Sequence, residues 1–157
     1  MLLYAFRFLS QQAGSTGRLQ MAKTNYEIDN YLNHLLRGVA FSYESNTNLY
    51  LALFTANPTT SGTQTSEATY TGYARVAIAR SSSSPFPADS TGVADANSSS
   101  ISFPACTGST STVTYLGVMD SLTAGNMLHF IQLSASLTVS AGITPVINAS
   151  GLTFTES

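Results

Sequence analysis

Residues 48–57 read N-L-Y-L-A-L-F-T-A-N, and this stretch determines how the rest of the chain is interpreted. In an extended conformation, its leucines fall on one face and its aromatic residues on the other. Because both faces are mostly apolar, the pattern is typical of a strand that is buried on both sides. Pro58 ends the strand, since proline offers no amide donor to a ladder and restricts the residue before it. We therefore expect a central strand here.

Strand-like segments continue toward the C-terminus. Closely spaced short strands of this kind favour a mainly β fold, here an antiparallel β-sandwich or a barrel-like sheet. Pro104 makes one of them an edge strand or a bulge, and the arginines of another are expected to mark its wetter positions. The turn at 120–126 (D-S-L-T-A-G-N) suits a positive φ at Gly125. The expected strands are 70–80, 101–106, 112–119, 127–133, 137–139, 143–147 and 152–155.

One amphipathic helix is predicted near the N-terminus, over residues 24–38. Thr24 and Glu27 have the spacing of a capping box, and Gly38 can take the left-handed conformation that ends a helix. Leucine and isoleucine recur on one face between these ends, which predicts that the helix packs on a sheet. The apolar positions are Ile28, Leu32, Leu35 and Leu36.

A single β-rich domain is expected at residues 21–157, preceded by a separate N-terminal segment and containing one long loop. Residues 1–20 are either an N-terminal arm that docks on a neighbouring subunit or an extension that precedes a natural start at Met21. The Ser-rich stretch 81–100 is long for a loop in a compact domain, so it is either a floppy surface loop or a contact with another subunit. Its Pro85-Phe86-Pro87 sequence would present a rigid aromatic ring.

The composition excludes several function classes. Charged residues make up 9% of the 157 residues, compared with about 25% in an average soluble domain. So few charges would hardly keep a free monomer soluble, which indicates that much of the surface contacts other protein subunits. The net charge is −2, and the six lysines and arginines are scattered, with none beyond Arg80. This pattern argues against nucleic-acid binding. The apolar residues 1–9 are too few to span a membrane.

No catalytic or metal-binding constellation is present in the sequence. It contains neither a phosphate-binding P-loop nor a nucleophile elbow. The two histidines and the single cysteine are too far apart in sequence to form a standard zinc site. We expect Cys106 to be a small core residue and His34 to lie at the surface. The sequence therefore predicts a non-enzymatic protein without cofactor, metal or small-molecule substrate.

Three stretches together resemble a family of small tailed-phage virion proteins, often labelled tail-fibre-like. They are N-Y-L-N-H-L-L-R-G at 30–38 followed by Y-L-A-L-F-T-A-N-P at 50–58, G-Y-A-R at 72–75, and V-T-Y-L-G-V-M-D-S-L-T-A-G-N-M-L-H-F at 113–130 running on to A-S-G-L-T-F-T-E at 149–156. The resemblance implies a structural component of the virion, assembled in the host bacterial cytoplasm, without catalysis or cofactor. Residues 1–20 and the long loop at 81–100 depart from the family pattern.

Two hypotheses for the place in the virion follow. The first is a capsid decoration or cement protein that stabilises contacts between shell subunits. The second is a tail fibre, baseplate or other tail subunit. In one version of this hypothesis the subunit binds the host surface, with Tyr70, Tyr73 or Phe86 available to stack on sugar. A free-standing enzyme or lectin outside any virus forms a third class. Both virion hypotheses expect self-association and phage structural proteins as partners, either the major capsid protein or tail proteins. The candidate subunit contacts are Leu2, Leu3, Tyr4, Phe6, Phe8 and Phe86.

Overall fold

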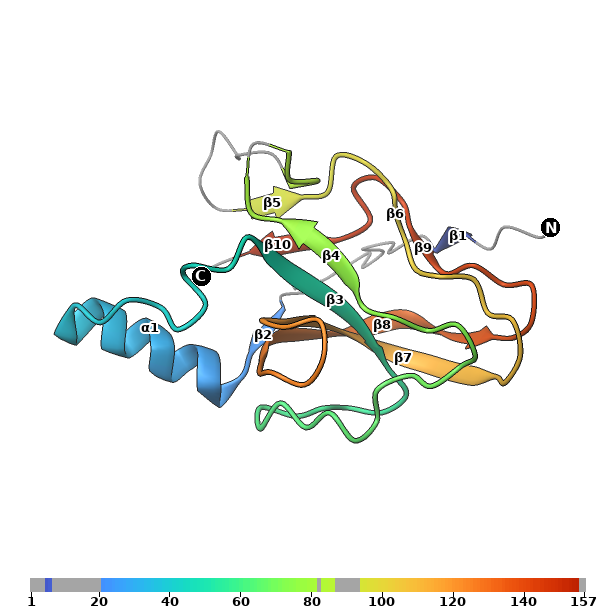
Figure 1. The fold of residues 1–157 in the computed structure, drawn as a ribbon, viewed down its shortest axis with the longest axis horizontal. Helices are drawn as coiled ribbons and strands as arrows, with labels where there is room; N and C mark the ends of the chain where they lie inside the picture. Colours follow the sequence, from blue (N-terminus) through green and yellow to red (C-terminus); the bar gives the residue numbers. More distant parts are fainter. Residues whose placement is uncertain (1–4, 7–20, 82, 87–93, 156–157) are drawn as a thin grey trace, which may run out of the picture.

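A five-stranded antiparallel sheet in the order β2-β8-β7-β3-β4 forms the centre of the molecule (Figure 1). The computed structural model describes residues 5–6, 21–81, 83–86 and 94–155. The strands are β2 (Ala22–Lys23), β3 (Asn48–Phe54), β4 (Val76–Ala79), β7 (Ser111–Met119) and β8 (Met127–Val139). Strand β3 lies between β7 and β4, and its last four residues are buried. The predicted central strand is confirmed, although it ends at Phe54 and residues 55–57 are exposed.

Two small sheets form a second layer over one face of the large sheet. One has the order β1-β9-β6 and the other pairs β10 with β5. Their strands are β1 (Ala5–Phe6), β5 (Ala94–Ala96), β6 (Ile101–Ser102), β9 (Val146–Ile147) and β10 (Thr153–Thr155). Leu51 and Leu116 of the large sheet share a core cluster with Ile101 and Ile147. The fold is thus mainly β with antiparallel sheets, apart from the parallel β1–β9 pair, and its described strands do not close into a barrel.

The opposite face of the large sheet carries a second, smaller apolar cluster that includes Phe54 and Met127. Loop residues lie against it, since a Cβ added to Gly62 would come within 3.2 Å of the Met127 Cβ. The Gln64 Nε2 donates to the Gly125 carbonyl at 2.7 Å, which joins this loop to the 120–126 turn. Gly125 has the predicted positive φ, 71°. Both faces of β3 are therefore covered by the chain itself.

Several predicted strand boundaries are wrong. The two strands predicted at 127–133 and 137–139 form one 13-residue strand, β8. Residues 134–136 are small, polar and exposed, which is typical of a turn, but the hydrogen-bond ladder with β7 continues past them through a register shift. The Ser-rich stretch contains β5, which pairs with β10. Fully buried Asn97 secures this pairing, because its side chain bonds the backbones of Ser99, Asn148 and Leu152. Strand β6 lies at a sheet edge, as Pro104 predicts.

The predicted helix, α1 (Asn25–Arg37), is present with the expected caps. The Thr24 side chain accepts a hydrogen bond from the Glu27 amide at 3.3 Å, and Gly38 ends the helix with φ of 66°. The prediction that α1 packs on a sheet is wrong. Glu27 is its only buried residue, and the helix extends away from the sheets at the left of Figure 1.

Candidate interaction surfaces

The segment that follows α1 turns back along the polar face of the helix. We call residues 40–46 the return segment. The Ser42 amide donates to the Asn30 Oδ1 at 3.2 Å, and the Ser42 hydroxyl pairs with the Tyr26 hydroxyl. The rings of His34 and Phe41 stack with centroids 4.5 Å apart. Because Tyr26, Asn30 and His34 are spaced by four residues, they lie on one side of the helix. The polar side of α1 is therefore covered by its own chain.

The opposite side of α1 carries an apolar stripe that is largely exposed, although the Lys23 ammonium lies 4.8 Å from the centroid of the Tyr31 ring. We call the following set the α1 stripe: Ile28, Tyr31, Leu32, Leu35, Leu36 and Val39, with exposed fractions of 41, 46, 44, 61, 74 and 52%. The helix begins on the sheet, since the Thr24 amide donates to the Leu128 carbonyl of β8 at 2.9 Å. The axis then leads away from β8, so the stripe has no sheet beneath it (Figure 1).

A cavity of about 250 Å³ lies where α1, the return segment and the large sheet meet. The Tyr43 hydroxyl contacts both Glu27 carboxylate oxygens, at 2.7 and 2.8 Å. Burial, reinforced by the Glu27 carboxylate, raises the pKa of Tyr43 above its ordinary range. The His129 Nε2 lies 4.0 Å from the Glu27 Oε1. The Arg80 guanidinium donates to the Tyr43 carbonyl at 2.6 Å. These polar groups hold the base of the helix and the return segment to the sheet.

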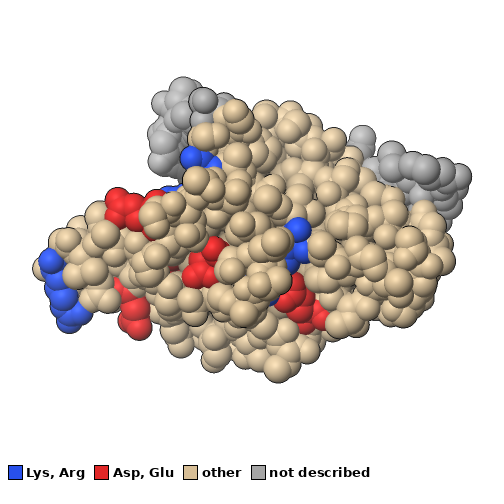
Figure 2. Space-filling model, viewed as in Figure 1, with Lys and Arg blue, Asp and Glu red and all other residues tan. Residues whose placement is uncertain are grey.

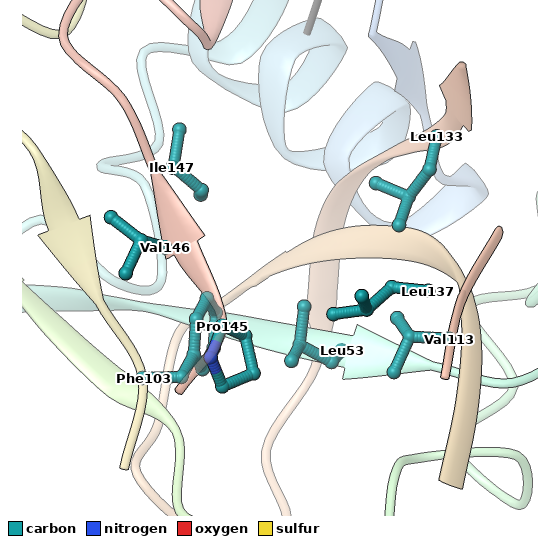
Figure 3. A pocket seen from close by; sticks show the side chains of 8 residues that line it. All are labelled: Leu53, Phe103, Val113, Leu133, Leu137, Pro145, Val146 and Ile147. Atoms are coloured by element: carbon teal, nitrogen blue, oxygen red, sulfur yellow. The ribbon is translucent and has the colours of Figure 1, made fainter. Parts of the chain in front are cut away.

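A much smaller void of about 10 Å³ lies between the large sheet and the β1-β9-β6 sheet. Figure 3 shows the side chains around it, among them Leu53, Phe103, Leu137 and Val146. All the lining side chains are apolar, and the space holds at most about one water molecule, which would need polar partners. The void is therefore a packing gap in the core and not a ligand site.

Arg75, in the G-Y-A-R stretch, is a buried structural residue with an exposed fraction of 8%. The expectation that Arg75 marks a solvent-exposed position of the strand is wrong. All five of its N–H donors are used: two meet Glu67 at 2.7 and 2.8 Å, one meets Gln64, and two meet the carbonyls of Ser121 and Ala124. Burial alone would lower the pKa of Arg75, but its hydrogen bond with Glu67 and the carboxylate charge raise it. Arg75 thus ties two loops to the edge strand β4.

The structure tests little of the predicted set of subunit contacts. Leu2, Leu3, Tyr4 and Phe8 lie outside the described residues. The backbone of Phe6 lies in β1 beside Ile147, while its side chain is not described. Phe86 is half-buried, and its ring packs edge-on against Phe154 of the same chain at 5.1 Å. The role of these residues at a subunit contact stays a prediction.

The aromatic residues considered for sugar stacking are largely occupied within the fold. Tyr70 is 2% exposed and donates to the Pro104 carbonyl at 3.0 Å, so the hypothesis that its ring is available is wrong. The Tyr73 hydroxyl donates to Glu67 and accepts from the Leu53 amide. Cys106 is buried in the core, as expected. His34 lies at the surface, also as expected.

The described residues offer no further chemical site. Within them, no three His, Cys, Asp or Glu side chains come together as metal ligands. The same part of the chain has no helix with the length and hydrophobicity needed to cross a bilayer. Figure 2 shows a face on which charged side chains are few and scattered among uncharged ones. Of the exposed large apolar side chains in the described part of the chain, all except Leu122 belong to the α1 stripe.

Comparison with known families identifies one that matches most of the chain. A family model described as the podophage GP4 fiber I protein gp80 matches residues 22–155. The match covers α1 and every described strand except β1. A search of curated proteins found no match. Because the family model spans most of the chain and nearly the whole described fold, the chain belongs to the family of the podophage GP4 fiber I protein gp80.

Proposed function

We propose that this chain is a structural subunit of a tail fibre in the virion of a tailed phage, and that it has no catalytic activity. The observation that carries the proposal is the family match over residues 22–155, whose description names a fibre protein. The partners in this role are other tail proteins and further copies of the chain.

The contacts of the buried polar residues support a structural role. Arg75 bonds two loops, Asn97 bonds three backbone groups and Glu27 accepts from Tyr43. Each of these side chains holds parts of the fold together. A catalytic acid or base needs a reactive group that can reach a substrate proton. These side chains instead stabilise the positions of loops and of the helix base.

The fibre role is favoured over capsid decoration by the wording of the family description. The capsid hypothesis rests on arms at residues 1–20 and 81–100, most of which lie outside the described residues or within the fold around β5. Binding of the host surface by this subunit has weaker support, since Tyr70 is buried and Phe86 packs on Phe154.

The test is the location of the protein in purified particles. Heads and tails are separated after mild disruption, and each fraction is quantified for this chain by mass spectrometry against the major capsid and tail proteins. We expect the protein in the tail fraction, at a small whole-number ratio to a known tail protein. Recovery with heads, at a fixed ratio to the shell protein, would instead support capsid decoration. Absence from both fractions would exclude a virion role.

A further inference from the structure

We propose that the cavity where α1, the return segment and the large sheet meet binds a ligand that carries an aromatic ring and a carboxylate. The cavity has a volume of about 250 Å³. Since an apolar cavity of about 150 Å³ holds one benzene molecule, this cavity has room for a ring with a short substituent. The same chemistry is found in a free aromatic acid and in the aromatic C-terminal residue of a polypeptide.

One wall of the cavity is apolar and belongs to the main core. Four strands of the large sheet contribute to this wall, β3, β4, β7 and β8, with the side chains of Leu49, Ile78, Val118 and Leu128. Three of these side chains are buried, and Leu49 packs against the same cluster. Such a wall offers water no hydrogen bond, and covering it with an apolar group is favourable. The wall therefore selects an apolar part of the ligand.

A second wall consists of aromatic rings. The Phe86 and Phe154 rings meet edge to face with centroids 5.1 Å apart, and the His129 ring meets Phe154 in the same way at 6.1 Å. All three residues line the cavity, and Phe86 and Phe154 are only half-buried. Aromatic rings prefer offset-stacked or edge-to-face neighbours. A further ring from a ligand extends this arrangement, which favours an aromatic ligand over an aliphatic one.

Arg80 supplies the positive charge of the cavity lining. Its Nη1 donates to three carbonyls of the return segment, those of Tyr43, Glu44 and Asn46, at 2.6, 3.2 and 3.1 Å. Its Nε and Nη2, which carry three N–H groups, donate to no described residue. An Nε–Nη2 pair matches the two oxygens of a carboxylate. Because Nη1 already holds the guanidinium in place, binding costs less ordering of this side chain.

Glu27 determines at which end of the cavity the carboxylate of the ligand lies. It is 7% exposed, and both of its carboxylate oxygens accept from the Tyr43 hydroxyl. Tyr43 thus separates the two charges, since its hydroxyl contacts Glu27 and its carbonyl contacts Arg80. Like charges repel, so we expect the carboxylate of the ligand at Arg80. A cationic ligand fits less well, because Glu27 has its partners within the fold and Arg80 would repel the ligand.

This inference does not depend on the proposed location in the tail. Ligand binding is a property of the purified chain, so its failure would leave the fibre proposal intact. Conversely, recovery of the protein from phage heads would not affect it.

The test is a titration of the full chain with 3-phenylpropionate, followed by saturation-transfer NMR. Three analogues each change one feature of this probe: 3-phenylpropanamide lacks the negative charge, hexanoate lacks the ring, and phenethylamine has a positive charge. We expect 3-phenylpropionate to bind at least about tenfold more tightly than the amide, because a neutral group makes weaker hydrogen bonds with Arg80. Hexanoate and phenethylamine are also expected to bind more weakly than 3-phenylpropionate.

A matched pair of arginine variants locates the carboxylate. Arg80→Gln removes the guanidinium and should weaken the binding of 3-phenylpropionate by about 10- to 100-fold. Arg37→Gln is the control, since Arg37 is also exposed but lies in the last turn of α1 and does not line the cavity. This control variant should bind as the unaltered chain does.

Phe86→Leu is the second variant, in case Arg80→Gln fails to fold. It keeps an apolar side chain but removes the ring, and should weaken binding by about 2- to 10-fold. A circular dichroism spectrum of each variant shows whether it is folded. Four outcomes would overturn the proposal: no saturable binding of 3-phenylpropionate, equal binding of the acid and its amide, tighter binding of phenethylamine, or unchanged binding by folded Arg80→Gln.

The source of the ligand is distinguished by a short peptide, acetyl-Gly-Gly-Phe, as the free acid and as the C-terminal amide. Tighter binding of the peptide acid than of 3-phenylpropionate, together with loss of binding for the peptide amide, would identify the C-terminal residue of a polypeptide. Tighter binding of 3-phenylpropionate than of either peptide would identify a free aromatic acid. Both results support an aromatic carboxylate as the occupant.

Discussion

Strand β3 and helix α1 are both rich in large apolar side chains, but the surroundings of these side chains are opposite. In β3 both faces are covered by the chain itself, and Leu51 and Phe54 are fully buried. In α1 the polar face is covered by the return segment, while the apolar face has exposed fractions of 41% or more. An apolar pattern therefore identifies the side chains that need a partner. Whether that partner comes from the same chain is decided by where the element begins and where its axis leads.

The largest expected contrast comes from the same substitution in the two regions. Leu116→Ala in the core should lower the free energy of unfolding by about 2–5 kcal/mol, because it leaves a cavity among fully buried neighbours. Leu35→Ala should change the stability of the monomer by less than about 0.5 kcal/mol, because Leu35 is 61% exposed. Urea denaturation, at dilutions where stability no longer depends on concentration, measures both values. Similar losses would mean that α1 packs on its own chain.

A second contrast uses two arginines. Arg75→Ala removes a buried partner of Glu67 and five hydrogen bonds, and should cost about 3 kcal/mol of unfolding free energy. Arg80→Ala removes an exposed side chain that donates to carbonyls of the return segment, and should cost less than about 1 kcal/mol. The same denaturation experiment compares the two variants. Equal costs would contradict the structural role assigned to Arg75.

The Tyr43→Phe variant tests the contacts that hold the N-terminal end of α1 to the return segment. This variant removes the hydroxyl that donates to the buried Glu27 carboxylate and should cost about 1–2 kcal/mol. The loss should be local, so amide hydrogen exchange should accelerate in α1 and the return segment but not in β3 or β7. Uniform acceleration across the sheet would mean that the helix base and the sheet unfold as one unit.

The last expected effect is a change in stability at high pH. Burial raises the pKa of Tyr70 to about 12, whereas an unfolded tyrosine titrates near 10. Because the folded state holds this proton more tightly, the stabilisation is complete below about pH 10 and is lost as the pH rises toward 12. Thermal unfolding between these values should show a shallower decline for Tyr70→Phe than for the unaltered chain. If the stability of both proteins falls equally with rising pH, ionisable groups other than Tyr70 dominate the pH dependence.

The sequence predicted the elements better than their lengths. The central strand, the capped helix, the Gly125 turn and the edge strand at Pro104 follow from local rules on alternation, capping and proline geometry. The continuous strand β8 and the short strand β5 were missed, because each is defined by hydrogen bonds to a distant partner. Segments rich in Ser and Thr have the composition of turns, so they are not recognised as strands until their partner strand is known.

The candidate sites show the same limit. Arg75 looked like a surface residue, because a sequence cannot show that Glu67 and the carbonyls of Ser121 and Ala124 surround its guanidinium. The aromatic residues Phe41 and Tyr43 follow closely after Gly38. They could have predicted that the chain turns back along the helix, where they contact His34 and Glu27. The family resemblance was present in short stretches, and the match over residues 22–155 confirms it.

By itself, the sequence determined which side chains must leave water and which local geometries the backbone takes. Low charge, alternating strands and a capped amphipathic helix are local properties, and they fixed the fold class. Only the tertiary structure decided which apolar face finds its partner inside the chain. Burial depends on the position of elements far apart in sequence, and here Thr24 anchors α1 to β8 so that its axis leads away from the sheet. The α1 stripe is left exposed for that reason.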